Sequence, residues 1–254
     1  YTHTAAATGT TRLINTIYDL SKVGTITASG ITGTLFAIST AADLYNLALY
    51  LQKSSAITGD KTFFLTNDID LSGYSNWVGI GTRSKQFAGV FDGCGYKITG
   101  LKINEADPSV SIDRGLFNIA CDATFKNLTI SDVTINGSSV TNRDKAAINV
   151  GALLGQGWSN NISGITIENA KITIEGNATA GGIIGYNSGP TTITNCSTSG
   201  SIEGKDGAIA GGVAGWGAGL HADMIRSSMR LSAGSGDYIL GGIFGYQAGW
   251  DISS

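Results

Sequence analysis

The sequence predicts an all-β protein, a right-handed parallel β-helix (solenoid) of about seven coils with an N-terminal amphipathic capping helix. The first observation is a glycine-rich block that returns at a fixed interval, since the blocks at 181–186, 211–216 and 241–246 begin 30 residues apart. The second is that short runs in which Ile alternates with Thr lie between the blocks. Such a repeat is typical of a solenoid, and the right-handed winding follows by analogy with other parallel crossovers.

The composition is that of a glycine-rich folded chain with few charges. Of 254 residues, 42% are hydrophobic and 14% are charged, which excludes general disorder. A net charge of −3 without a basic run argues against nucleic acid as a partner. No apolar run reaches the roughly 18 residues of a membrane span, so we expect no membrane insertion. The N-terminal residues lack the charged-then-apolar pattern of a signal peptide, and for an exported chain we expect a signal peptide already removed.

Residues 1–37 are predicted to form an N-terminal extension, followed by a β-helix domain at 38–254. Apolar residues at helical spacing predict a short helix over 11–20. Positions 24–38 are strand-like, and the apolar run at 35–38 is expected to be buried. We interpret the extension as a segment that docks on another subunit or donates a strand to it.

A helix is predicted over 40–53, at the start of the solenoid. Thr40 and Asp43 have the residue types that cap a helix N-terminus, because a hydroxyl oxygen accepts from backbone N–H groups and an acid suits the positive end of the helix dipole. Apolar residues then recur at helical spacing: Leu44, Leu47, Ala48 and Leu51. We expect this helix to cover the first coil.

Strands are predicted in every coil from residue 60 onward. Apolar and polar residues alternate over 68–73, and the clearest pair of strands is 165–167 with 172–174. Outward Thr, Ser and Asn side chains would form ladders between neighbouring coils. Turns rich in Gly, Ser and Asn follow each glycine block.

The glycine blocks are predicted to mark places where the backbone lies too close to its neighbour for a Cβ atom, or where φ is positive. The structural glycines are Gly151, Gly155, Gly181, Gly182, Gly185, Gly211, Gly212, Gly215, Gly241, Gly242 and Gly245.

Three cysteines cannot all pair within the chain. Cys94, Cys121 and Cys196 are also too far apart in sequence for a zinc knuckle. We expect them to be buried small apolar residues inside the coils.

The blocks at 151–250 resemble the GLUG-type glycine-rich repeat of bacterial surface proteins, adhesins and the non-catalytic regions of some immunoglobulin A peptidases. The segments at 38–44, 65–72 and 91–101 resemble the region that precedes such repeats. The resemblance implies a right-handed parallel β-helix at a cell surface, and it brings no catalytic residues. The His-Glu-x-x-His motif of those peptidases is absent from this sequence.

One column of the aligned blocks contains three aromatic residues. Tyr186, Trp216 and Tyr246 occupy matching positions, with Gln156 before them. Facing inward they would form a core ladder, and facing outward they would offer a stacking or binding platform for a glycan or a neighbouring chain. Packing in the core or at a turn is the favoured interpretation.

Three other groups of residues are candidate sites. His221 with Asp223 is interpreted as a solvent-facing loop pair, because no nucleophile is marked beside it. The Asp68, Asp70 and Ser72 pattern begins like a calcium loop, but Gly79 stands where the last acid is expected. Glu175 and Glu203 fall near a common column without forming an acid cluster. We therefore predict no enzyme activity, no cofactor and no metal site.

The first hypothesis for function is an extracellular or cell-surface protein with a structural or adhesive role. End-to-end assembly into a homo-oligomeric filament would use residues 1–37 and an open C-terminal coil. A glycan or a host surface protein is the other expected partner. The alternatives are a non-catalytic module of a larger adhesin or secreted peptidase and, less favoured, a carbohydrate-active enzyme.

Overall fold

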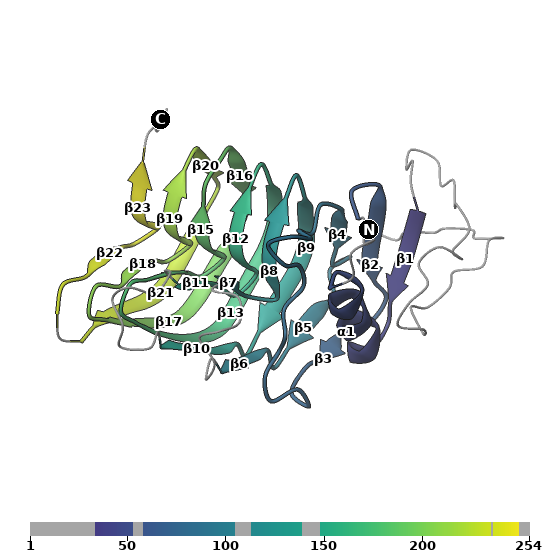
Figure 1. The fold of residues 1–254 in the computed structure, drawn as a ribbon, viewed down its shortest axis with the longest axis horizontal. Coiled ribbons are helices and arrows are strands. Elements are labelled where there is room, and N and C mark those ends of the chain that lie inside the picture. The colour runs from purple at the N-terminus through teal and green to yellow at the C-terminus, as the bar shows by residue number, and fades with distance from the viewer. Residues whose placement is uncertain (1–33, 53–57, 105–112, 139–147, 235, 249–254) are drawn as a thin grey trace.

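The chain folds into a parallel β-solenoid of about six turns, with one short helix among the residues that the structure describes (Figure 1). The computed structural model describes residues 34–52, 58–104, 113–138, 148–234 and 236–248. Strands β1 (Thr34–Ile38) and β23 (Phe244–Ala248) lie at opposite ends of the stack. The predicted helix over 11–20 lies outside the described residues.

Three parallel sheets form the walls of the solenoid. Sheet I has thirteen strands: β1, β2 (Lys61–Leu65), β3 (Ile69–Asp70), β4 (Val90–Asp92), β5 (Lys97–Thr99), β6 (Lys102–Asn104), β9 (Thr124–Ser131), β10 (Thr134–Ser138), β13 (Asn161–Glu175), β16 (Thr191–Thr194), β17 (Ser197–Lys205), β20 (Leu220–Asp223) and β21 (Arg226–Ala233). Sheet II has five: β7 (Asp113–Arg114), β11 (Ile148–Gly151), β14 (Ala178–Gly181), β18 (Ile209–Gly211) and β22 (Ile239–Gly241). Sheet III has five: β8 (Phe117–Cys121), β12 (Leu154–Trp158), β15 (Ile184–Asn187), β19 (Ala214–Ala218) and β23.

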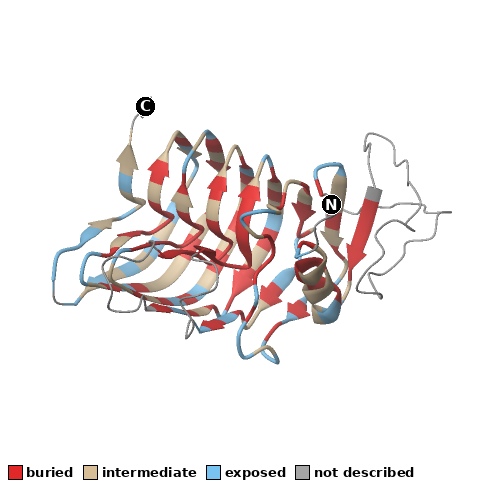
Figure 2. Ribbon diagram, in the orientation of Figure 1, coloured by how far each residue is buried: buried red, intermediate tan, exposed pale blue. Residues whose placement is uncertain are grey.

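Buried residues recur along the strands from turn to turn (Figure 2). Most of their side chains are apolar and fill the interior in columns. One column of sheet I, each member at 0% exposure, runs through Phe36, Phe63, Phe91, Phe125, Ile162 and Ile193. Most of the Thr and Lys residues beside these apolar positions are only partly buried, as the alternation predicts, whereas Ser131 and Thr191 are buried. Burial of such columns removes apolar surface from water in every turn, which stabilises the stack.

Sheet I bends at one residue of positive φ in each of five successive turns. These residues are Cys94, Asn127, Gly164, Asn195 and Met224, with φ of 52°, 54°, 62°, 51° and 52°. Asn and Gly adopt this conformation at low energetic penalty, which explains their use at this bend. The bend places the two halves of each turn of sheet I at an angle and creates a corner on its outer face.

The helix α1 (Ala41–Tyr50) confirms the prediction over 40–53 and is shorter at its C-terminal end. Oγ1 of Thr40 accepts from the backbone N–H of Asp43 at 3.1 Å, and Oδ2 of Asp43 accepts from the N–H of Thr40 at 2.9 Å. This reciprocal arrangement is a capping box. The predicted apolar stripe is buried in the core at the N-terminal end of the stack.

The cap gives a first testable prediction. Thr40→Ala removes the acceptor for the Asp43 N–H and should lower the free energy of unfolding by about 1 kcal/mol. Thr40→Ser keeps the hydroxyl and should stay close to wild type. Chemical denaturation followed by circular dichroism measures both variants, and an equal loss in both would show that the hydroxyl is not what stabilises the cap.

Two sequence predictions about the coils require correction. The count is about six turns rather than seven. Among the described residues the named strands of sheets II and III begin at β7 and β8, and parallel bridges from Ile80 to Phe117 and from Phe87 to Ala120 extend sheet III into the preceding turn. The predicted strands 165–167 and 172–174 are both parts of one strand, β13, which has positive φ at Asn169 and a register shift between Ile167 and Ala170, between the two predicted strands.

The first strand also bears on the domain boundary. β1 pairs in parallel with β2, and Phe36 and Ile38 are fully buried. Among the described residues, sheet I therefore begins at Thr34, four residues before the boundary expected at 38. The division into 1–37 and 38–254 otherwise stays a prediction.

Candidate functional site

The glycine blocks lie where sheets II and III approach each other closely. A Cβ atom added at Gly181 would collide with the carbonyl oxygens of Ile184 and Val213, and one added at Gly185 would collide with the backbone nitrogen of Val150. Ten of the eleven block glycines meet a backbone atom in this way, at less than the 3.0 Å that real Cβ contacts respect. None of the eleven has positive φ. Close approach of the backbone, and not an unusual φ, accounts for these glycines.

The exception is Gly242, around which an added Cβ would meet nothing within 4 Å. The equivalent Gly182 and Gly212, one and two turns earlier in the stack, each face the carbonyl oxygen of the glycine in the following turn. Gly242 lies in the last described turn and therefore has no such neighbour among the described residues.

The aromatic column forms a stacked ladder on the outer face of sheet III. Tyr186, Trp216 and Tyr246 are in register with one another and with Gln156. The ring centroids of Tyr186 and Trp216 are 4.4 Å apart with planes at 7°, and those of Trp216 and Tyr246 are 6.1 Å apart at 18°. Tyr186 and Trp216 are half-buried and Tyr246 is 46% exposed, so the rings face outward rather than into the core.

This geometry limits what the ladder can bind. Both faces of Trp216 lie against the neighbouring rings, so a sugar cannot stack on either face while the ladder is intact. The ring edges and the tyrosine hydroxyls are what the ladder presents to solvent. Ring stacking therefore stabilises the association of the turns, and an extended platform for sugars is not formed.

A buried polar network was missed by the sequence analysis. Asp113 is at 0% exposure, and Nδ2 of Asn149 donates to its Oδ1 at 2.6 Å. Oγ1 of Thr179 in turn donates to Oδ1 of Asn149 at 2.8 Å, and Nε of Arg83 lies 3.7 Å from Oδ2 of Asp113. Burial raises the pKa of the Asp113 carboxyl, and the hydrogen bond from Asn149 and the positive charges of Arg83 and Arg114 oppose this increase. A carboxyl closed off from solvent links three turns of sheet II and is not placed to meet a substrate.

The network predicts a pH effect with a defined sign. Because the pKa of Asp113 is raised in the folded chain, its contribution to stability is fully present below the ordinary value of 3.8 and is lost as the pH rises through the folded value. Asp113→Asn keeps the acceptor for Asn149 and removes the charge. The free energy of unfolding of wild type relative to this variant should therefore fall as the pH rises above about 4.

Urea denaturation at several pH values measures this difference. Asp237→Asn, which removes a carboxylate from an exposed position, is the matched control. A constant difference between wild type and Asp113→Asn across the range would contradict the assignment.

The other candidate groups from the sequence, His221 with Asp223 and Asp68 with Asp70, are not brought together with further residues into a site. His221 and Asp223 lie exposed on one face of strand β20, and not in the loop that was expected. The Asp68 and Asp70 carboxylates accept from the backbone N–H groups of Lys97 and Ser72, both at 2.8 Å. Within the ranges that the structure describes, no group of three or more His, Cys, Asp or Glu residues could hold a metal ion.

Glu175 and Glu203 do not share a column. Register pairs Glu203 with Thr173 and Glu175 with Lys205, so the two acids are two residues out of step. Oε1 of Glu203 lies 3.3 Å from Nζ of Lys205. This lysine therefore balances the acid, and Glu175 and Glu203 do not form a pair of facing carboxylates of the kind that cleaves glycans.

The prediction that the cysteines are buried is confirmed for one of the three. Cys196 is buried, whereas Cys94 and Cys121 are half-buried, and all three are free thiols. Burial raises the pKa of Cys94 to about 12 and those of Cys121 and Cys196 to about 11. Such thiols hold their proton at neutral pH and are poor nucleophiles.

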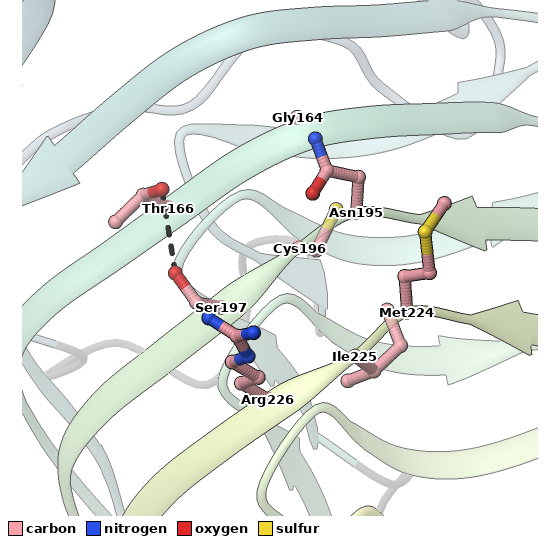
Figure 3. A pocket seen from close by; sticks show the side chains of 8 residues that line it. All are labelled: Gly164, Thr166, Asn195, Cys196, Ser197, Met224, Ile225 and Arg226. Carbon is pink, nitrogen blue, oxygen red and sulfur yellow. Dashed lines mark hydrogen bonds between the residues drawn. The ribbon is translucent and has the colours of Figure 1, made fainter.

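A pocket of about 460 Å³ lies at the outer corner of sheet I (Figure 3). Its charged member is Arg226, and Ser197 and Thr166 lie beside it, with Oγ of Ser197 donating to Oγ1 of Thr166 at 3.3 Å. Asn195 and Met224, two of the residues with positive φ, complete one side. The pocket is open to solvent and contains no acid or imidazole, so its chemistry is that of polar binding.

Part of the chain is similar in sequence to a known protein. No family model matches the chain, and the resemblance to the GLUG-type repeat stays a prediction. A stretch of 144 residues, 55% of this chain, is 31% identical to a protein of Evansella cellulosilytica described as a Gly-rich membrane protein. The match spans 14% of the length of that protein. Among the described residues, the single helix is too short to cross a membrane.

One solved structure aligns along most of the chain. It is the crystal structure of a protein from Bacteroides ovatus described as an immunoglobulin A1 protease, and the alignment covers 83% of this chain and 84% of that chain. Sequence identity is 16% and the TM-score is 0.41. At this score the likeness carries no argument about function.

Proposed function

We propose that this chain is a non-catalytic structural module of a surface protein. The observation that carries the proposal is the match to a Gly-rich membrane protein of which the matched stretch is 14%, a proportion expected for one module in a long chain. The fold agrees with this role, because stacked turns with a filled interior form a stiff rod that holds other parts of a protein away from a membrane. Its polar outer faces are available for adhesive contacts.

Surface location is tested on intact cells that produce the full-length protein. An antibody raised against the purified chain should label these cells without permeabilisation, and external protease should remove the label. Labelling that needs permeabilised cells would overturn the proposal. A cytoplasmic protein of the same cells, which should stay unlabelled, is the control for intact membranes.

A second proposal, end-to-end assembly, has support from the last described turn. Ile239 is 44% exposed and Tyr246 46% exposed, and Leu240 and Phe244 are only partly buried. Ala210 and Ala214, which pair with Leu240 and Phe244 from one turn earlier, are at 0% exposure. We propose that the residues 1–37 of another copy cover this turn, which would propagate into a filament.

The assembly is tested by comparing the full chain with a variant that lacks residues 1–33, which keeps all of β1. The full chain should form fibres in electron micrographs and sediment as a range of sizes, and the shortened chain should stay a folded monomer. Uniform monomers of the full chain would contradict self-assembly and would favour another segment of a longer protein as the cover. Fibres that persist in the shortened chain would exclude the N-terminal segment as the docking element.

A further inference from the structure

A column of basic and hydroxyl side chains crosses the outer face of sheet I. The register places these residues side by side on five successive strands: Lys102, Thr134, Lys171, Ser201 and Arg230. The three basic residues are exposed and the two hydroxyl residues are half-buried. We call this set the basic column. It contains no acid, although the protein as a whole has a net charge of −3.

Of the acids near the basic column, Glu168 and Glu203 pair with lysines outside it, and Asp132 accepts from Nδ2 of Asn169 at 2.7 Å. The carboxylate of Asp70 interacts electrostatically with Lys102. Oε2 of Glu168 lies 3.3 Å from Nζ of Lys97, and Oε1 of Glu203 lies 3.3 Å from Nζ of Lys205. In the part of the chain that the structure describes, Lys171 and Arg230 have no carboxylate within ion-pair distance. Their charges are therefore available to an anionic partner.

The spacing of the charges selects the kind of anion. Neighbouring strands are about 4.8 Å apart, so a basic residue on every second strand repeats at about 9.6 Å. Duplex DNA carries one phosphate about every 3.4 Å on each strand, a charge density that the basic column does not match. An extended polysaccharide with a carboxylate on every second sugar has a charge repeat close to that of the column. The hydroxyls of Thr134 and Ser201 lie between the bases, where hydrogen bonds to sugar hydroxyls form.

We propose that the basic column binds an extended acidic polysaccharide whose charge repeats with the disaccharide. The polymer runs along the solenoid axis, across the strands of sheet I. Carboxylates pair with Lys102, Lys171 and Arg230, and sugar hydroxyls contact the intervening residues. Binding depends on the purified chain alone, so it stands or fails separately from the surface location proposed above.

The probe is a set of hyaluronan fragments, in which a carboxylate recurs in every disaccharide, and calorimetry measures their affinity for the full chain. Lys171→Gln and Arg230→Gln should each weaken binding by about fivefold, the upper range for one exposed ion pair. Added salt should weaken binding of the wild type. Fragments with methyl-esterified carboxyls should bind much more weakly.

Lys85→Gln is the control, because it removes one positive charge from a position between β3 and β4, outside both sheet I and the basic column. It should change the affinity by less than twofold. Circular dichroism confirms that each variant is folded. Equal binding of esterified fragments, unchanged affinity in Lys171→Gln and Arg230→Gln, no binding at all, or tighter binding of duplex DNA would each overturn the proposal.

Discussion

Gly182→Ala should destabilise the protein by at least about 3 kcal/mol, at the upper end of what overpacking causes. The new methyl group would collide with the carbonyl oxygen of Gly212 in the next turn and would lie 2.9 Å from a methyl carbon of Thr198. Neither neighbour can move easily, because Oγ1 of Thr198 donates to that same carbonyl oxygen at 2.7 Å. Relief requires that the two turns separate, which breaks ladder hydrogen bonds in sheets II and III.

Gly242→Ala is the matched control, at the equivalent position two turns later. Its Cβ meets nothing within 4 Å and φ is not positive, so the change should be neutral or stabilising by about 0.4–1 kcal/mol through the unfolded chain. Chemical denaturation followed by circular dichroism measures both variants. Equal destabilisation by the two substitutions would show that helix or strand preference, rather than the contact between turns, governs these glycines.

Phe117→Ala should lower the free energy of unfolding by about 3–5 kcal/mol. Phe117 is at 0% exposure and its ring centroid lies 4.9 Å from that of Phe87, 5.1 Å from that of Phe91 and 4.7 Å from that of Phe125. These rings come from four separate strands and loops around the middle of the stack, so a cavity there cannot close by the movement of one element.

Tyr96→Ala provides the comparison, because Tyr96 is 38% exposed. Its loss should stay within about 0.5 kcal/mol, as for most surface substitutions. Thermal and chemical denaturation give the two values under the same conditions. A loss for Phe117→Ala that is no larger than the loss for Tyr96→Ala would contradict the packing described here.

The 30-residue period was sufficient to predict the register of the later turns. The columns of Gly157 with Asn187 and of Tyr186 with Trp216 follow directly from it, because these turns have equal lengths. The same reasoning fails for the basic column, whose members are 32, 37, 30 and 29 residues apart. Loops of unequal length between the turns hide such a column from a fixed period.

The orientation of the aromatic ladder could not be predicted by simple alternation. Ile184 is buried, and strict alternation along β15 would place Tyr186 inside as well. In the structure Asn187 is buried and Tyr186 is not, and the register between β12 and β15 passes over Gly155 and Gly185. The close approach of the backbone at these glycines changes the side of the sheet on which the next residue lies.

The buried Asp113 network illustrates a different difficulty. Asn149 and Thr179 are 30 residues apart and could have been aligned, but Asp113 precedes Asn149 by 36 residues. The insertion removes the one acid of the network from its expected column. The signal in the sequence was a polar residue at the same interior position of successive turns. It can be recognised only when the register between the turns is known.

The most direct test of the account is disulfide formation between turns, because every inference above depends on the register of the stack. Thr192 and His221 are partners in neighbouring strands. Their Cα atoms are about 4.8 Å apart, which lies within the range of Cα separations that a disulfide spans. The double variant Thr192→Cys with His221→Cys should therefore form this disulfide, identified by peptide mass spectrometry. Thr192→Cys with Asp223→Cys places the thiols about 8 Å apart and should not. Efficient linkage of the second pair and not the first would contradict the register, and with it the glycine contacts, the aromatic ladder and the basic column.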